Sequence, residues 1–179
     1  MNKLAEKKKS YFQKLKGTKV HSGLPCPKLS DAFLSGLGVS IVLSFLAFLT
    51  FEFKAAILFL PFSASAFIIF ALPKAPVAQP RSVIGGHVLS ALVGVACYVG
   101  LGQSFWVVGL TGGVVAALMV VTKTWHPPAV CTALIPVMTP IGNWLWVSYP
   151  VGIGAVIVVI IGLLYNNLLK DRTYPDFWW

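Results

Sequence analysis

Residues 31–51 read DAFLSGLGVSIVLSFLAFLTF, a run in which Asp31 is the only charged side chain. At about 1.5 Å of rise per residue, a helix over this range is long enough to cross the roughly 30 Å hydrocarbon core of a bilayer. Its apolar residues form one continuous run rather than the spaced pattern of an amphipathic surface helix. The stretch therefore predicts a transmembrane helix.

The composition of the whole chain is also that of an integral membrane protein. Of its 179 residues, 57% are apolar and only 11% are charged, with 5 acidic residues against 14 Lys and Arg. So few acidic residues cannot supply the mixed charge of a water-facing surface. The composition therefore excludes a soluble enzyme.

Five further apolar segments follow the first. They cover residues 55–72, 82–101, 105–121, 127–141 and 146–169. Segment 55–72 contains Pro61, and segment 127–141 begins on two prolines and contains Pro136, so each is expected to be a broken or half-length helix. We expect an all-α membrane protein with four full transmembrane helices and two Pro-led short helices, giving up to six crossings.

The basic residues indicate how such a bundle is oriented. Eight of the fourteen precede residue 29. If all six segments cross and the N-terminus is cytoplasmic, 13 basic residues lie inside and only Lys54 lies outside; if the two short segments return to their own side, Lys74, Arg81 and Lys123 move outside and the split is 10 to 4. The positive-inside rule favours six crossings. Both arrangements place both termini in the cytoplasm, and we expect a multi-pass protein of a bacterial inner membrane.

The lysines of the N-terminal tail indicate what the tail binds. Because its lysines flank the first apolar run, an anionic lipid surface is the expected partner, and nucleic acid is not. A solvated tail that only fixes the orientation is the alternative. We expect cytoplasmic tails at residues 1–30 and 171–179 on either side of a transmembrane domain at residues 31–170.

A weak internal repeat relates the two halves of the chain. A shift of 67 residues gives five identities in a 25-residue window: Pro61 with Pro128, Ala66 with Ala133, Ile68 with Ile135, Pro73 with Pro140 and Gly85 with Gly152. Ser65 falls opposite Thr132. Each half would hold three segments, an odd number, so six crossings would invert one half relative to the other. Transporters use such inverted repeats and bind substrate near the midplane, where the halves meet.

The prolines suggest what this meeting point could bind. Pro61 and Pro128 are expected to begin the two short helices, because the first turn does not need the N–H that proline lacks. A helix N-terminus carries free N–H groups and about half a positive charge, so an anion is its natural ligand. Small or hydroxyl-bearing residues occupy both first turns, namely Ser63, Ala64, Ser65 and Thr132. The alternative is that these residues only let helices pack closely in lipid.

Two histidines and one loop add polar groups to the apolar segments. His87 lies inside segment 82–101, and an ionisable residue at that depth is a functional hypothesis by default. It could hydrogen-bond an anion, carry a proton, or be a neutral ring held by a backbone carbonyl. His126 precedes Pro127 and could cap the helix start or touch substrate. Gln79 and Arg81 lie in a loop, where Arg81 is either an anion entrance or a topology signal.

No motif indicates a catalytic or metal centre. The three cysteines, Cys26, Cys97 and Cys131, are scattered without ligand spacing, and the chain has neither a GxSxG motif nor an acidic pair inside an apolar segment. We therefore expect no enzyme activity, no metal and no cofactor.

The segment Trp125-His126-Pro127-Pro128-Ala129 resembles the HPP family of integral membrane proteins, named for its His-Pro-Pro triplet. Similarity extends to PFSASA at 61–66, PVAQPRSVIGGHVLSA at 76–91 and YPDFW at 174–178, and covers about residues 30–178. The family is usually described with four spans and has been linked to nitrite transport in plastids and cyanobacteria. The resemblance therefore implies an anion permease.

The family motifs map onto eleven positions of this sequence. They are Ser63, Ala64, Ser65, Gln79, Pro80, Gly86, His87, His126, Pro127, Pro128 and Thr132. The chain departs from the family pattern at Ser63, where Gly is common, and at Val130 and Cys131, where smaller residues are common. These departures bear on the substrate rather than on the fold.

The sequence thus predicts a permease for a small monovalent anion, with nitrite as the first candidate. The expected substrate-binding residues are Ser63, Ala64, Ser65, His87, His126, Pro127, Pro128 and Thr132, with Gln79 and Arg81 at an entrance. A membrane scaffold or assembly partner that transports nothing is the alternative. Small-residue faces pack well in lipid, so a homo-oligomer is a further expectation.

Overall fold

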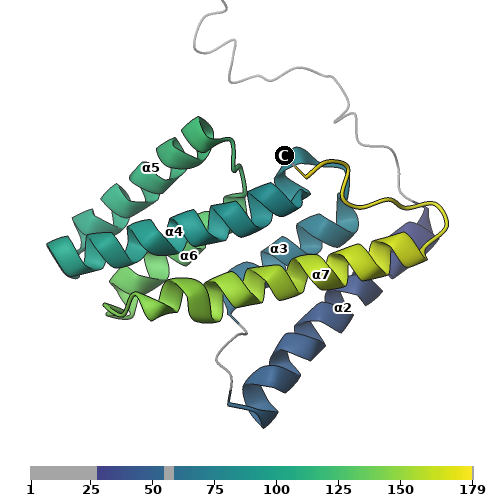
Figure 1. Ribbon diagram of the computed structural model, residues 1–179, viewed down its shortest axis with the longest axis horizontal. Helices are drawn as coiled ribbons and strands as arrows, with labels where there is room; N and C mark the ends of the chain where they lie inside the picture. The colour runs from purple at the N-terminus through teal and green to yellow at the C-terminus, as the bar shows by residue number, and fades with distance from the viewer. Residues whose placement is uncertain (1–27, 55–58, 179) are drawn as a thin grey trace, which may run out of the picture.

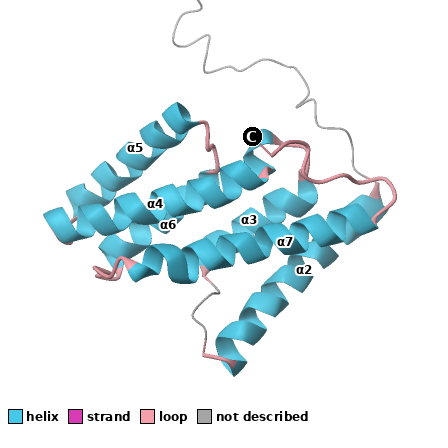
Figure 2. Ribbon diagram, in the orientation of Figure 1, coloured by secondary structure: helices cyan, strands magenta, loops and turns pink. Residues whose placement is uncertain are grey.

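The computed structural model describes residues 28–54 and 59–178, and all regular structure within these ranges is helical (Figures 1 and 2). The elements are α2 (Leu29–Glu52), α3 (Leu60–Ala71), the 3-10 turn η1 (Pro76–Ala78), α4 (Pro80–Leu101), α5 (Phe105–Thr122), α6 (Pro127–Met138), the π-helical turn η2 (Val147–Gly152) and α7 (Ile153–Leu168). Residues 1–27 lie outside the described residues, and with them most of the basic tail for which we predicted a lipid partner.

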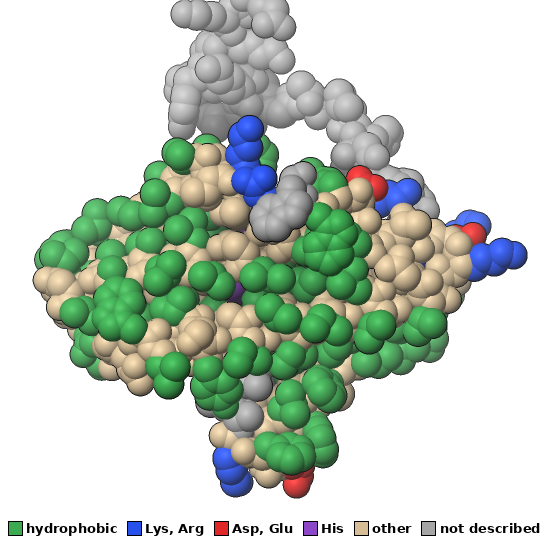
Figure 3. Space-filling view, in the orientation of Figure 1, with side chains coloured by type: hydrophobic (Ala, Val, Ile, Leu, Met, Phe, Trp, Pro, Cys, Tyr) green, Lys and Arg blue, Asp and Glu red, His purple; other side chains and the backbone are tan. Residues whose placement is uncertain are grey.

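Four helices are long and apolar enough to cross a membrane, as predicted. They are α2, α4, α5 and the stretch Val147–Leu168, in which η2 is kinked at the extended residue Tyr149 before α7, whereas α3 and α6 are short. Their outer faces carry large apolar side chains such as Phe33 and Leu164, which are more than half exposed. Such a surface suits lipid rather than water. In Figure 3 charged side chains lie at the margins of the molecule, and green apolar side chains spread over the face between them.

The chain passes six times between the two ends of the bundle. We call the end where α2 and α4 begin the first end. Polar contacts fix the direction of the other helices: the Ser35 hydroxyl of α2 donates to the Phe70 carbonyl where α3 ends, and Arg81 of α4 donates to the Thr122 carbonyl where α5 ends. At the opposite, second end the Gln103 amide donates to the Met138 carbonyl where α6 ends. Four of these passes are made by helices long enough to cross a membrane, and six crossings stay a prediction.

The two short helices both start in the middle of the bundle and run to opposite ends. α3 has proline at its second position, and α6 has proline at its first two positions. Proline suits the first turn of a helix. The preceding residues, Phe59 and His126, have extended backbones, as expected directly before or near a proline. The N-terminal turns of α3 and α6 therefore meet at the centre.

The helix boundaries support the inverted repeat. A shift of 67 residues carries α3 (60–71) onto α6 (127–138), and α4 (80–101) onto the helix 147–168. In Figure 1 a half turn about the viewing direction brings α2, α3 and α4 close to the positions of α5, α6 and α7. Three helices therefore repeat in inverted orientation, as the odd number of segments in each half requires.

A row of small residues lets α4 lie close to the chain around α6. A Cβ added at Gly94 would lie 2.3 Å from the Ala133 carbonyl oxygen, and one added at Gly86 would lie 2.9 Å from the Cβ of His126. Close helix approach through small residues is typical of membrane proteins. At Gly86 this close approach lets His126 reach the centre of the bundle.

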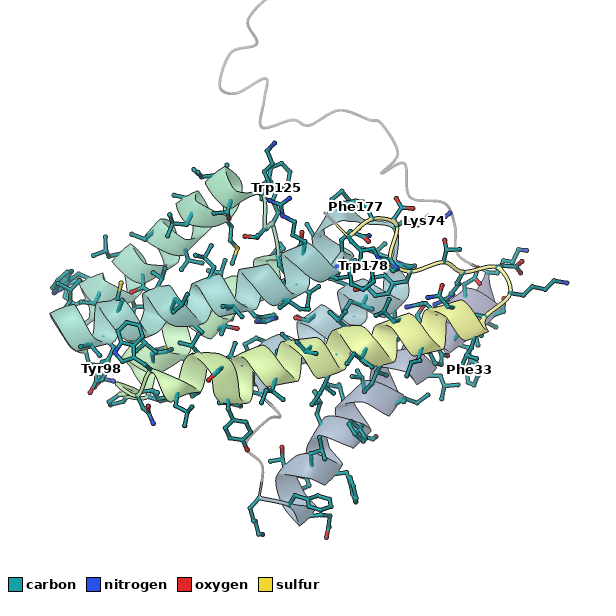
Figure 4. All side chains as sticks on the ribbon, in the orientation of Figure 1. Phe33, Lys74, Tyr98, Trp125, Phe177 and Trp178 are labelled. Carbon is teal, nitrogen blue, oxygen red and sulfur yellow. The ribbon has the colours of Figure 1, made fainter. Side chains whose placement is uncertain are left out.

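The C-terminal segment folds back over the first end. Figure 4 shows Phe177 and Trp178 beside Lys74, and Tyr98 at the far end of the molecule. The Tyr174 hydroxyl donates to the Ala78 carbonyl at 2.8 Å, and the backbone N–H of Asp176 donates to Oε1 of Gln79 at 2.8 Å. These contacts hold the loop before α4 in place.

Candidate functional site

Four fully buried polar side chains meet where α3 and α6 begin. Ser65 comes from α3, His87 from α4, Thr132 from α6, and His126 is the residue that precedes α6; none has exposed surface. We call these four residues the histidine cluster. They come from both halves of the repeat, so the cluster lies where the halves meet.

Short hydrogen bonds join the cluster into one chain. The Ser65 Oγ lies 2.8 Å from Nε2 of His87 and 2.8 Å from Nε2 of His126. At the two ends of the chain, His87 Nδ1 lies 2.8 Å from Oγ1 of Thr132, and His126 Nδ1 lies 2.7 Å from the Val77 carbonyl oxygen. Every ring nitrogen of the two histidines therefore has a partner.

The Val77 carbonyl sets the direction of these hydrogen bonds. A carbonyl only accepts, so His126 Nδ1 carries a hydrogen, and in a neutral ring Nε2 then accepts from the Ser65 hydroxyl. The Ser65 oxygen in turn accepts from Nε2–H of His87, whose Nδ1 accepts from the Thr132 hydroxyl. Two neutral histidines are thus fully satisfied, with no charge inside the bundle.

A second arrangement accommodates one extra proton. The Ser65 Oγ also lies 3.0 Å from the Pro61 carbonyl oxygen, which can take its single hydrogen. Nε2 of His126 would then need its own hydrogen to bond to Ser65, and the ring would be an imidazolium. The neutral cluster and the cluster with one extra proton therefore differ in the orientation of the Ser65 hydroxyl group.

Aromatic rings close the cluster from the side of α3 and η2. The ring centroid of Phe62 lies 5.0 Å from that of His87, and that of Phe59 lies 6.3 Å from both His87 and Trp146. Phe62 has no exposed surface. These rings exclude solvent from the histidine cluster on this side.

Helical periodicity divides the predicted site residues into two groups. Ser65, His87, His126 and Thr132 come together, and Pro128 is buried beside them at the start of α6. Ser63, Ala64 and Pro127 are exposed on the outer sides of their helices. The Ser63 hydroxyl donates to the Leu60 carbonyl and lines a hollow of about 540 Å³ between α2 and α3, away from His87.

Gln79 and Arg81 hold the loops of the first end together. Gln79 has no exposed surface, and its amide nitrogen donates to the carbonyls of Pro73 and Ala75 at 2.9 and 3.0 Å. Arg81 donates to the Thr122 carbonyl at 2.9 Å. Gln79 is thus engaged on both amide atoms, and Arg81 lies at the negative, C-terminal end of α5.

The expectation of free backbone N–H groups is wrong for the first turn of α6. Pro127 and Pro128 have none, and the Ala129 N–H donates to the His126 carbonyl at 2.9 Å. In α3 the Phe62 N–H is likewise bonded to the Phe59 carbonyl. The donors at the centre are therefore the side chains, although both helix dipoles still direct positive potential towards it.

Two contributors were missed by sequence reasoning. The Val77 carbonyl carries no side-chain signal, and only the fold brings it to His126. Phe59 could have been found, because the shift of 67 residues sets it opposite His126. Within residues 28–54 and 59–178, no group of three or more His, Cys, Asp and Glu could hold a metal ion.

Four long apolar helices and two half-length helices that meet at a buried polar cluster define an α-helical membrane protein. The family model described as "HPP, transmembrane region" matches residues 24–175. The chain belongs to the HPP family, which confirms the resemblance drawn from the triplet His126-Pro127-Pro128.

Two curated relatives come from Dictyostelium discoideum, and each is named only as a transmembrane protein. The chain is 36% identical to one over 180 residues and 35% identical to the other over 185 residues, in each case across 94% of this chain. It spans 63% and 57% of the length of these relatives. No solved structure matches the chain.

Proposed function

We propose that this chain is a permease for a small monovalent anion, with nitrite as the first candidate, and not an enzyme. The observation that carries the proposal is the histidine cluster at the point where two oppositely directed half-length helices begin. Inverted repeats with broken helices place substrate sites of secondary transporters at this position. Family membership and the four long apolar helices support a membrane role.

The charges around the cluster suit an anion. The acidic residues of the described chain all lie at helix ends or in the C-terminal segment, namely Asp31, Glu52, Asp171 and Asp176. A buried carboxylate would repel an anion, whereas hydroxyl and imidazole N–H groups donate hydrogen bonds to it. The N-termini of α3 and α6 add positive potential from both sides.

The same chemistry allows proton coupling. An anion that entered the cluster would compete for the donors Ser65 and Thr132, and a proton on His126 would offset its charge. Either passive or proton-coupled transport is compatible with this exchange. The first end, which carries Lys74, Arg81 and Lys123, is proposed to face the cytoplasm of a plasma membrane by the positive-inside rule.

The test compares a double substitution in the histidine cluster with a single substitution on the outer side of α3. In proteoliposomes, Ser65→Ala combined with Thr132→Val should reduce nitrite uptake at least about tenfold, since a lost transition-state contribution of 1.4 kcal/mol is tenfold in rate. Ser63→Ala, which removes a hydroxyl from the outer side of α3, should leave uptake unchanged. Wild-type uptake in the double variant would overturn the proposal.

A membrane scaffold is the second candidate, and one observation favours it. Every polar atom of the cluster already has a partner within the described residues, as a purely structural network would require. A scaffold predicts no uptake by the wild-type protein and no selective stabilisation by nitrite, nitrate, formate, bicarbonate or chloride. If the protein is instead a permease, an anion that binds only the folded protein should raise the free energy of unfolding by about 2.7 kcal/mol at 100 times its Kd.

A further inference from the structure

Two fully buried hydroxyl groups have no hydrogen-bond partner in the described part of the chain. They are Ser90 Oγ on α4 and Thr111 Oγ1 on α5, and neither residue has exposed surface. By contrast, the hydroxyls of Thr122 and Thr139 each donate to the carbonyl four residues earlier. A buried hydroxyl without a hydrogen-bond partner lowers the free energy of unfolding by about 1–3 kcal/mol. The two hydroxyls therefore point to a ligand that accepts hydrogen bonds from them.

Ser90 faces the interface between α4 and α6. It lies four residues from Gly86 and from Gly94, and residues at this spacing share one helix face. A Cβ at Gly86 would be 3.5 Å from Ala129, and a Cβ at Gly94 would meet Ala133. Ser90 therefore lies one turn from His87, on the way to the second end.

Thr111 faces the same interface from α5. It shares a buried row with Val115, four residues away, and Val115 packs in one cluster with Ala129 and Ala133. Its neighbour Gly112 lies against Leu134 of α6. At the second end, the Ser104 hydroxyl that precedes α5 is also buried without a partner. Two unpartnered hydroxyls thus lie in the interface between the cluster and the second end, and a third lies at the start of α5 at that end.

The equivalent route towards the first end is filled. There α2, α3 and α7 enclose a large apolar core that includes Leu46, Phe62 and Phe70, all without exposed surface. Under the 67-residue shift Phe62 corresponds to Ala129 of the second route. One half of the repeat therefore packs phenyl rings into its interface beside the buried Asn166, whereas the other combines Val115 and Met119 with small side chains and two unpartnered hydroxyls.

We propose that the interface of α4, α5 and α6 is the passage through which the histidine cluster opens to the second end, and that its ligand is the permeating anion with its water. Ser104, Thr111 and Ser90 donate hydrogen bonds along it in that order. The identity of the solute rests on the proposed function. The existence of the passage does not.

The test uses cysteine accessibility at two positions related by the repeat. In the full chain with Cys26, Cys97 and Cys131 replaced by Ala, Ala133→Cys lies in the passage and Ala66→Cys lies in the apolar core; both residues are fully buried. A small charged methanethiosulfonate needs a hydrated thiol, so it should modify Ala133→Cys at least about tenfold faster than Ala66→Cys. Modification should occur from the membrane face that carries Lys54.

Equal, slow modification of both cysteines would overturn the passage, as would faster modification of Ala66→Cys. If Ala133→Cys does not fold, Ser90→Cys, nearly the same size as the native residue, takes its place. Nitrite flux is measured on the same reconstituted protein. Fast modification without any flux overturns the proposed function and keeps the passage, whereas flux with an unreactive Ala133→Cys and an unreactive Ser90→Cys overturns the passage alone.

Discussion

Tyr174 shows what a single side chain outside the long helices contributes. Its ring is 1% exposed, and its hydroxyl donates to the Ala78 carbonyl. Burial raises the pKa of this phenol above its usual value near 10. Because the folded pKa is raised, the contribution of Tyr174 is fully present below pH 10 and is lost as the pH rises further, when the unfolded chain ionises first.

We predict that Tyr174→Phe lowers the free energy of unfolding by about 1–3 kcal/mol at neutral pH, because it leaves the buried Ala78 carbonyl without its donor. It should also remove part of the stability loss above pH 10. Thermal unfolding in detergent at two pH values measures both effects. Tyr98→Phe, a half-buried tyrosine at the other end, is the control; an equal loss in both variants would contradict this account.

Single residues also show where sequence reasoning stopped. Ser63 and Ser65 were grouped because both follow Pro61, yet successive helix residues are about 100° apart, so these two face nearly opposite sides. Periodicity alone could have separated them once the start of α3 was known. The bond between His126 and the Val77 carbonyl could not be predicted, because it joins two loops through tertiary packing.

At the scale of helices, the contact of α4 with α6 depends on Gly94. A Cβ there would lie 2.3 Å from the Ala133 carbonyl, a backbone atom that cannot move without shifting α6. We predict that Gly94→Ala lowers stability by about 1–3 kcal/mol through overpacking, despite the better helix propensity of alanine. Thermal unfolding in detergent is the measurement.

Gly109→Ala on α5 is the matched control for that prediction. A Cβ at Gly109 meets nothing within 4 Å, so only the helix propensity changes. This variant should gain up to about 1 kcal/mol. If both variants gain stability, the close contact between α4 and α6 is not as described.

The helices themselves were largely predictable. Long apolar runs gave all four spans to within a few residues, because length and hydropathy alone decide a crossing. The prolines gave the starts of α3 and α6, because their chemistry acts locally. The repeat also predicted that both short helices start at one point, and the structure shows them meeting there through Ser65 and His126.

At the scale of the whole molecule, the charges and the topology make one prediction. Lys54 follows α2 at the second end, and Lys74 follows α3 at the first end. In a cysteine-free background, Lys54→Cys and Lys74→Cys should therefore react with an impermeant maleimide from opposite faces of the membrane. Lys123→Cys should react from the same face as Lys74→Cys.

This measurement separates six passes from four. If the two short segments returned to their own sides, all three cysteines would react from one face. Which face carries Lys74 in cells tests the cytoplasmic orientation proposed from the basic residues.

The position of His87 has a consequence for how alike the two halves can be. Its ring nitrogens bond to Ser65 and Thr132, which are repeat equivalents, so the ring lies on the approximate twofold axis itself. A twofold axis would place a second copy of such a side chain in the same space, so only one copy can lie there. The equivalent residue, 67 positions later, is Gly154, which is buried and has no side chain. Two copies of the first half would thus crowd two imidazoles into one space, and two copies of the second would leave it empty. A chain of this design must break its own symmetry at the centre, and one unlike pair of residues suffices.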